Sequence, residues 1–341
     1  MARVFAVLNA LFRAEWRGQK SFQSVIGNNF FIVSAVLLQK AGGFIYLIVG
    51  LVMLFPLSTD PLRKIPASRL ELWPLEARDR RLLRLLSPWV NPMTWAIAAL
   101  ALWAARGRVT LGLWGLAAGL VFAGFLLSDL PFAPVYGMWR RIPQFPGPLN
   151  QLIRKNVREL FSTLDFYCAL LLSAATLAYR LLGAPLPAEA FLAVTILVVL
   201  ALSSYAQCLF GLDGAGGLSR YRLLPLRGWQ ILAAKDAAFL AVLVPLLLPL
   251  APWAGLGAGF VALAVGQEPS VRRIRPQTRW RFSSGSSLVL GLVQAGIMAA
   301  AAAGIQFTST LLLAPCLAAW AISLWGCGRI LEGEMEMSAQ S

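Results

Sequence analysis

The feature that most constrains this chain is the length of its stretches without a charged residue. Residues 282–328 contain no Asp, Glu, Lys or Arg, and residues 85–105, 109–128 and 190–212 are further uncharged stretches. A helix needs about 20 mostly apolar residues to cross the hydrocarbon core of a bilayer. The longest stretch therefore has room for two spans, and each of the others for one. This pattern predicts a polytopic membrane protein of the all-α class.

The predicted helical bundle has six clear spans and two less regular regions. The spans are expected at residues 89–105, 109–128, 162–181, 190–210, 286–304 and 307–327. Residues 21–59 and 237–267 are each too long for one helix and short for two, since the 31 residues of the latter make about 46 Å of helix. Basic segments flank both regions, which favours an even number of crossings. Each region is therefore expected to form a hairpin of short helices.

Composition and charge support this fold class and set the orientation. Hydrophobic residues make up 58% of the chain and charged residues only 13%, whereas soluble domains carry roughly a quarter charged residues. The net charge is +15, which in a polytopic membrane protein indicates basic loops on the cytoplasmic side and not a nucleic-acid partner. With the N-terminus inside, 26 of the 30 bases lie in cytoplasmic segments. An N-in, C-in topology is therefore expected.

The chain is interpreted as a single transmembrane domain, residues 1–341, made of two halves. Residues 1–24 place Phe5, Leu8, Phe12 and Trp16 on one helical stripe, which predicts an amphipathic helix lying on the inner membrane face. The remaining segments are a first half at 25–160 with the cytoplasmic loop 60–88, a second half at 161–331 with the cytoplasmic loops 213–236 and 267–285, and an acidic tail at 332–341 that is expected to be solvated.

An internal repeat marks two of the expected cytoplasmic loops. Residues 68–75 read Ser-Arg-Leu-Glu-Leu-Trp-Pro-Leu and residues 219–226 read Ser-Arg-Tyr-Arg-Leu-Leu-Pro-Leu, with five of eight positions identical at a constant offset of 151. Ten residues after the proline comes a base, Arg84 in the first copy and Lys235 in the second. Chance similarity of two Leu- and Arg-rich loops is one interpretation, and duplication of two related halves is the other. Because proline pre-sets a helix start, each motif is expected to lead into a helix with an exposed first turn.

The second copy and its surroundings resemble a known family. Phe210-Gly211-x-Asp213-x-x-Gly216-x-x-x-Arg220-Tyr221-x-Leu223-Leu224-Pro225-Leu226, followed by Ile231-Leu232-x-x-Lys235, is similar to the membrane subunits of ABC-2 type exporters. The order of features, with a basic amphipathic start, a membrane segment and a basic cytoplasmic loop before further spans, is also similar. The chain contains no Gly-x-x-x-x-Gly-Lys-Ser/Thr motif for ATP. The resemblance therefore implies a permease that has no ATPase or cofactor of its own.

The resemblance further implies partners, location and working residues. It implies that a separate cytoplasmic ABC ATPase binds a homodimer or heterodimer of permeases, which membrane lipid surrounds in the bacterial inner membrane. It also implies export of a hydrophobic or amphipathic substrate by alternating access. In that family, short cytoplasmic coupling helices convey the motion of the ATPase. By analogy, the residues of the coupling loops are Arg69, Pro74, Leu75, Glu76, Arg84, Asp213, Arg220, Tyr221, Pro225, Leu226, Arg227 and Lys235.

Two other function classes stay open on the sequence alone. A lipid-modifying membrane enzyme would need an acidic metal cluster or a base near the membrane surface. The chain has no histidine and its aspartates stand singly, so no catalytic residue and no metal site is expected. An ion-coupled secondary transporter would need ionisable groups inside its spans. The predicted spans are almost free of such groups: Asp165 and Arg180 lie near the ends of the span 162–181, which leaves Lys40 as the candidate.

Overall fold

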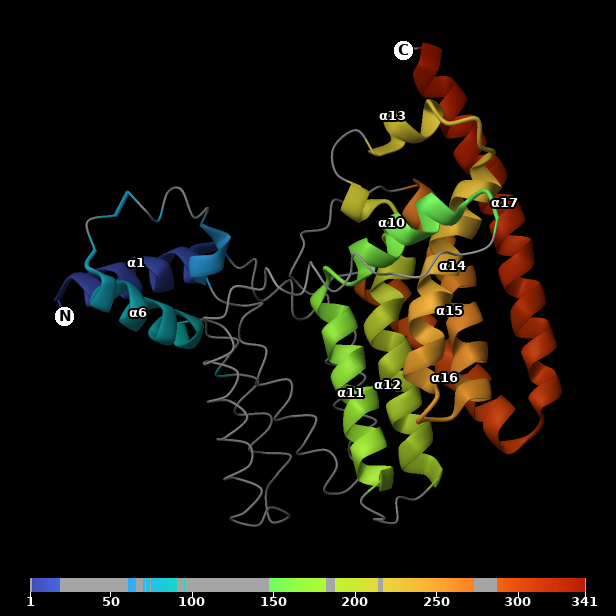
Figure 1. Cartoon of the computed structure of the whole chain (residues 1–341), viewed down its shortest axis with the longest axis horizontal. Coiled ribbons are helices and arrows are strands. Elements are labelled where there is room, and N and C mark those ends of the chain that lie inside the picture. The colour runs from blue at the N-terminus through green and yellow to red at the C-terminus, as the bar shows by residue number, and fades with distance from the viewer. Residues whose placement is uncertain are drawn as a thin grey trace. The chain divides into compact units, whose positions relative to one another are not determined.

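The computed structural model describes residues 2–18, 61–65, 70, 72–73, 75–90, 95, 147–181, 188–213, 217–272 and 287–340. Within these ranges every regular element is a helix (Figure 1), which confirms the predicted all-α class for this part of the chain. Contacts divide the chain into two compact units. The first comprises Met1–Ile26 and Leu38–Pro134, and the second comprises Gly27–Leu37 and Val135–Ser341.

The first unit is built around its N-terminal helix. Its described elements are α1 (Ala2–Gly18), η3 (Pro61–Lys64), α6 (Ala77–Leu86) and η4 (Ser87–Val90). The helix predicted within residues 1–24 is thus present over Ala2–Gly18, while its contact with the membrane face stays a prediction. Val4, Leu8 and Leu11 pack against the rest of the core, whereas Phe5 is 66% exposed. The apolar face of α1 is wider than one stripe, and the core covers only one edge of it.

The second unit is a helical bundle centred on α15. Its described elements are α10 (Asn150–Leu160), α11 (Leu164–Leu181), α12 (Ala188–Ala206), η6 (Gly211–Asp213), α13 (Gly217–Arg222), α14 (Gly228–Leu247), α15 (Pro252–Arg272), α16 (Leu288–Phe307), η7 (Thr310–Leu312) and α17 (Leu313–Gln340). α15 has its most extensive contacts with α17, α16 and α12. Figure 1 shows α10 and α13 at one end of the bundle, where α17 also ends.

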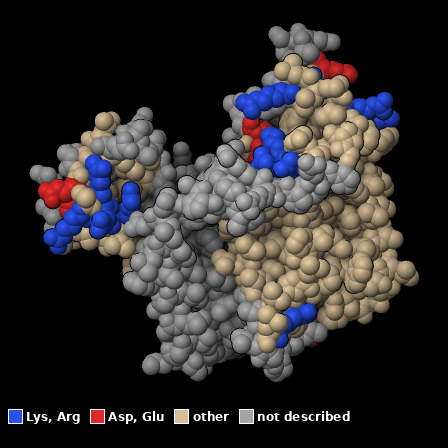
Figure 2. Space-filling model, in the orientation of Figure 1, with Lys and Arg blue, Asp and Glu red and all other residues tan. Residues whose placement is uncertain are grey.

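Four helices of the second unit are long and apolar enough to cross a membrane. They are α12, α14, α16 and α17, over Glu189–Ala206, Gly228–Leu247, Val289–Phe307 and Thr310–Glu336. In the face shown in Figure 2, charged side chains of this unit gather mostly at the end where α13 lies. Long apolar helices with charge concentrated at one end are typical of membrane proteins, so the structure supports a helical membrane protein.

The predicted spans agree with these helices in part. The spans expected at 190–210, 286–304 and 307–327 correspond to α12, α16 and α17. Residues 162–181 do form a single helix, α11, but it is not one of the four helices that are long and apolar enough to cross a membrane. The span expected at 109–128 and the hairpin expected at 21–59 lie outside the described residues, as does most of the span expected at 89–105. The membrane topology stays a prediction.

The region 237–267 forms a hairpin, but the prediction of short helices is wrong. α14 has 20 residues and begins at Gly228, while α15 has 21 residues and ends at Arg272. The prediction took Lys235 and Asp236 as the end of a loop because charged residues usually lie outside spans. Both side chains are instead fully buried in α14, since residues of neighbouring elements hydrogen-bond to them. The expected loop 213–236 therefore ends at Arg227.

The helices of the bundle approach closely where glycine faces a neighbour. A Cβ atom added to Gly266 of α15 would lie 2.7 Å from the carbonyl carbon and oxygen of Ala206 in α12. Real Cβ atoms do not approach backbone atoms so closely. The close contact between α12 and α15 is therefore possible only because Gly266 has no side chain. Small residues at helix crossings are a regular means of close packing in membrane bundles.

We predict that Gly266→Ala lowers the free energy of unfolding by about 1–3 kcal/mol, the usual cost of overpacking. Thermal unfolding of the purified protein in detergent measures this change. Gly296→Ala is the matched control, because a Cβ atom at Gly296 of α16 meets no atom within 4 Å. Equal unfolding temperatures for the two variants would contradict the close crossing of α12 and α15.

Candidate functional site

The two copies of the repeat share a pattern of backbone hydrogen bonds in their described residues. In each copy, two backbone hydrogen bonds form at positions that differ by the sequence offset of 151. They are Trp73 N–H to Leu70 O (3.2 Å) and Leu75 N–H to Trp73 O (2.7 Å) in the first copy, and Leu224 N–H to Tyr221 O (3.1 Å) and Leu226 N–H to Leu224 O (2.8 Å) in the second. The same turn thus forms in both units.

The helix that follows the turn also begins at equivalent positions. α6 begins at Ala77 and α14 at Gly228, as the motifs predict. The preceding residues are both extended, with φ −67° and ψ 159° at Glu76 and φ −74° and ψ 154° at Arg227. Leu72 and Leu223, which are equivalent, are 82% and 84% exposed. Agreement in turn, helix start and exposure favours duplication over chance similarity.

A second repeat, which the sequence analysis missed, extends this correspondence. Residues 8–17 read Leu-Asn-x-Leu-x-Arg-x-x-x-Arg, and residues 149–158 have the same five residues at an offset of 141. The first copy lies in α1, which packs against α6, and the second lies mostly in α10, which packs against α14. In both units this helix therefore packs on the helix that follows the turn. This second repeat has an offset of 141 and the first has an offset of 151, so comparing the halves at an offset of 151 alone does not reveal it.

The second unit contains a buried cluster of charges centred on Asp213, the last residue of η6. Its Oδ2 accepts a hydrogen bond from Lys235 Nζ at 2.8 Å, and its Oδ1 accepts from Lys155 Nζ and from the Tyr221 hydroxyl at 2.9 Å. Lys155 also pairs with Glu159 one turn further along α10, at 3.3 Å. Two bases thus face two carboxylates, and the cluster carries no net charge.

Lys235 uses all of its donors inside this cluster. Besides Asp213, its Nζ donates to the carbonyl oxygen of Leu209 at 2.7 Å and to Asn156 Oδ1 at 3.4 Å. An ammonium group has three donors and no acceptor, so the buried charge is fully hydrogen-bonded. The ammonium also lies 4.9 Å from the ring centroid of Phe210, within the range of a cation–π interaction. The cluster therefore joins α10, η6, α13 and α14.

The cluster changes the acidity of two groups outside the predicted spans. Burial alone would raise the pKa of Asp213, but Lys235 and Lys155 outweigh it and hold that pKa below its ordinary value. Burial and the charge of Asp213 raise the pKa of Tyr221 far above its ordinary value. Tyr221 thus stays a neutral donor and Asp213 an ionised acceptor.

The predicted coupling residues differ in burial and in contacts. Asp213, Tyr221 and Lys235 meet in the cluster, while Arg220, Pro225 and Arg227 are exposed and Leu226 is half-buried. In the first copy Leu75 is half-buried, Glu76 and Arg84 are exposed, and Arg69 and Pro74 lie outside the described residues. Lys155, Asn156 and Glu159 were not predicted. The repeated Leu-Asn-x-Leu motif that leads into them is the signal that could have drawn attention to α10.

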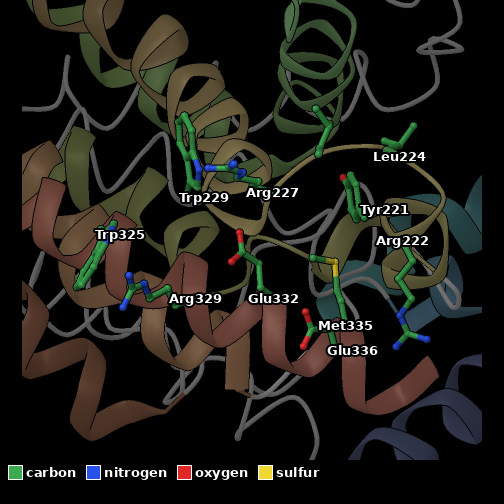
Figure 3. Close-up of a pocket in the computed structure, with 11 residues that line it drawn as sticks. Tyr221, Arg222, Leu224, Arg227, Trp229, Trp325, Arg329, Glu332, Met335 and Glu336 are labelled. Atoms are coloured by element: carbon green, nitrogen blue, oxygen red, sulfur yellow. The ribbon is translucent and has the colours of Figure 1, made fainter. Parts of the chain in front are cut away.

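A pocket of about 670 Å³ opens beside the cluster, between the α13–α14 turn and the end of α17 (Figure 3). It is lined by Tyr221, Arg222, Leu224, Leu226, Arg227, Trp229, Trp325, Arg329, Glu332, Met335 and Glu336. α14 and α17 nearly touch beside it, because a Cβ atom on Gly228 would lie 2.3 Å from the carbonyl oxygen of Gly328. Glycine is therefore required where the two helices cross.

The acidic tail takes part in this pocket, so the expectation that it is only solvated is wrong. α17 continues as a helix to Gln340, and Glu332 Oε1 accepts a hydrogen bond from the backbone N–H of Gly228 at 2.8 Å. The carboxylate is held there because the first backbone N–H groups of a helix lack partners within the helix. Nearby, the Arg329 guanidinium lies 4.0 Å from the Trp325 ring.

Comparison with known proteins adds no relative. No family model, no curated protein and no solved structure matches this chain. Conclusions on function therefore depend on the site itself and on the motif residues.

We predict that Lys235→Met destabilises the protein by about 3–5 kcal/mol, because removing one partner of a buried pair leaves the other charge uncompensated. Lys155→Met is the matched control. It removes the other base of Asp213, but its side chain is 41% exposed, so a smaller loss is expected. Unfolding in detergent measures both. Equal losses would contradict the assignment of Lys235 as the buried partner.

The lowered pKa of Asp213 also predicts a pH dependence. The stability contributed by its charge is fully present above the unfolded value of about 3.9 and is lost as the pH falls through the lower folded value. The unfolding temperature of the wild type is therefore expected to fall more steeply below pH 4 than that of Asp213→Asn. Parallel curves would mean that Asp213 titrates alike in both states.

Proposed function

We propose that this chain is the membrane-spanning permease subunit of an ATP-driven exporter, and that a separate cytoplasmic subunit hydrolyses ATP. The observation that carries the proposal is the apolar surface at the α13–α14 turn. Leu223, Leu224 and Trp229 are 84%, 43% and 42% exposed there, among charged residues at the end of the bundle. Large apolar groups gathered on a polar surface are typical of protein interaction sites.

The attachment of this turn to the bundle supports a role in transmitting motion. A surface can move a membrane helix only if it is rigidly joined to it. Tyr221, just before the turn, bonds to Asp213, and Asp213 bonds to Lys235 in α14. The start of α14 is in turn locked against α17 through Gly228 and Gly328. A displacement of the turn would therefore carry α14 and α17 with it.

The matched turn in the first unit supports the same proposal. Leu72 is exposed on this turn, and Leu223 is exposed at the equivalent position of the second unit. The first turn is followed by α6, and the second by α14. Transporters are frequently built from two related repeats, and a docking element in each half suits that architecture. On this proposal the chain lies in the bacterial inner membrane with both termini inside. It pairs with a second permease, alike or different, and exports a hydrophobic or amphipathic substrate by alternating access.

One observation favours a second candidate, ion-coupled transport. Lys235 and Asp236 lie inside α14, one of the four helices long enough to span a membrane, and ionisable groups within spans often belong to ion or proton pathways. In liposomes, the exporter proposal requires the ATPase subunit and ATP for transport. Transport driven by a proton or sodium gradient without them would favour the second candidate.

Double substitution of Leu223 and Trp229 by alanine tests the docking surface. We expect at least a tenfold loss of the ATPase that co-purifies with the chain from its native membrane, because central apolar anchors dominate interface affinity. The matched control is Leu248→Ala with Trp253→Ala. These residues are 68% and 58% exposed and lie beyond the other end of α14. An ATPase that never co-purifies with the wild type, or that is lost equally from both variants, would refute the proposal.

A further inference from the structure

A second polar site lies inside the bundle, one residue beyond Lys235. Asp236 is 0% exposed and is eight residues from the start of α14, which is about 12 Å along the helix. Its hydrogen-bond partners lie on other elements than those of Lys235. Its Oδ2 accepts from Gln267 Nε2 of α15 at 2.6 Å and from the Trp320 indole N–H of α17 at 2.9 Å.

Within the described residues, no base forms an ion pair with this carboxyl group. The ammonium of Lys235 donates to Asp213, Leu209 and Asn156 instead. Three further side chains are close enough to interact electrostatically with Asp236: Lys235, Tyr205 of α12 and Cys327 of α17. Lys235 is the positively charged one, but its hydrogen bonds go to other groups, so it acts on Asp236 only through space. An isolated carboxylate in an apolar interior is so unfavourable that such groups usually become neutral.

The other charged residues of the elements that contact α14 have different surroundings. Those residues are Lys155 and Glu159 in the charge cluster, Arg154 and Arg158 elsewhere on α10, Asp165 and Arg180 on α11, Glu189 at the start of α12, Glu268 and Arg272 paired with each other on α15, and Arg329, Glu332, Glu334 and Glu336 near the end of α17. None of them is a hydrogen-bond or ion-pair partner of Asp236. Within the described residues, the hydrogen-bond partners of the carboxyl group are thus two uncharged groups, the Gln267 amide and the Trp320 indole.

Two oxygen atoms at this site lack a hydrogen-bond partner in the described part of the chain, Asp236 Oδ1 and Gln267 Oε1. They belong to the same two side chains that are already joined through Gln267 Nε2 and Asp236 Oδ2. A carboxylic acid and a carboxamide form a closed pair when the amide N–H donates to one acid oxygen and the acid O–H donates to the amide oxygen. One proton would therefore satisfy both remaining oxygens, whereas a buried acceptor without a partner is destabilising.

We propose that Asp236 is a proton-binding site within the bundle, with the proton on Oδ1 donated to Gln267 Oε1. The proton makes the carboxyl group neutral and completes its pairing with α15, while Trp320 keeps its bond to Oδ2. Asp236 thus differs from Asp213, which is ionised between two bases. This site does not depend on the proposed exporter function.

Infrared difference spectroscopy of the full-length protein in detergent tests this assignment at neutral pH. A protonated carboxyl group gives a C=O stretching band above the amide I region, and the band shifts in D₂O. The wild type is expected to show such a band that is absent from Asp236→Asn. Asp213→Asn is the matched control and is expected to leave the band unchanged, because it removes an ionised carboxylate.

Stability supplies the second readout of the same experiment. Asp236→Asn is expected to keep the wild-type unfolding temperature, because an amide can pair with Gln267 as the neutral acid does, whereas Asp213→Asn is expected to lower it. Should Asp236→Asn fail to fold, Gln267→Leu is used, in which the acid band is expected to move because the partner of the O–H is gone.

Absence of the band from the wild type would overturn the proposal. If the band were absent and added sodium raised the unfolding temperature of the wild type but not of Asp236→Asn, the site would bind a metal cation instead. A band that persists in Asp236→Asn would assign the proton to another carboxyl group and would equally refute the proposal.

Discussion

The bonds to the Asp213 carboxylate hold together the parts of the second unit on which the proposed function depends. Lys235 brings α14 to this group, Lys155 brings α10, and Tyr221 brings the end of α13. With Glu159 the set is neutral, so burial costs desolvation but leaves no net charge inside the protein. Any other packing of these elements would leave a buried charge without its partner. The cluster therefore fixes one arrangement of the turn relative to α14, which apolar contacts alone would fix less strictly.

Features with a local signal could be predicted from the sequence, and features that depend on tertiary contacts could not. Uncharged stretches located α12, α16 and α17, and the proline motifs located the starts of α6 and α14, because adjacent residues determine where a helix begins. Asp213, Tyr221 and Lys235 were selected from a family resemblance. Their meeting with Lys155, which lies 58 positions before Asp213, depends on how α10 packs, and spacing in the sequence does not encode that packing.

Charged residues misled the prediction of α14 for a physical reason. A charge marks the end of a span when only water or lipid headgroups can solvate it. Lys235 is instead solvated by oxygen atoms from α10 and from the segment after α12, and Asp236 by α15 and α17. A span that lies inside a bundle can therefore continue through a charged pair when its neighbours supply polar groups. The same argument applies to Glu332, which binds the start of α14 and is not simply part of a solvated tail.

The two units hold the short helix before the turn by different interactions. At the repeat offset of 151, Leu62 stands where the second unit has Asp213, and both residues lie in a short 3₁₀ helix before the turn. Leu62 packs with Leu83 and with Leu8 of α1, whereas Asp213 binds the bases of α10 and α14. Apolar contact is non-directional, but a hydrogen-bonded ion pair requires one partner in one geometry. If a bound partner displaces both turns, we expect α14 to move together with its turn, and α6 to move less than its turn does. The two halves would then be related in backbone but unequal in the motion that they pass to the membrane helices.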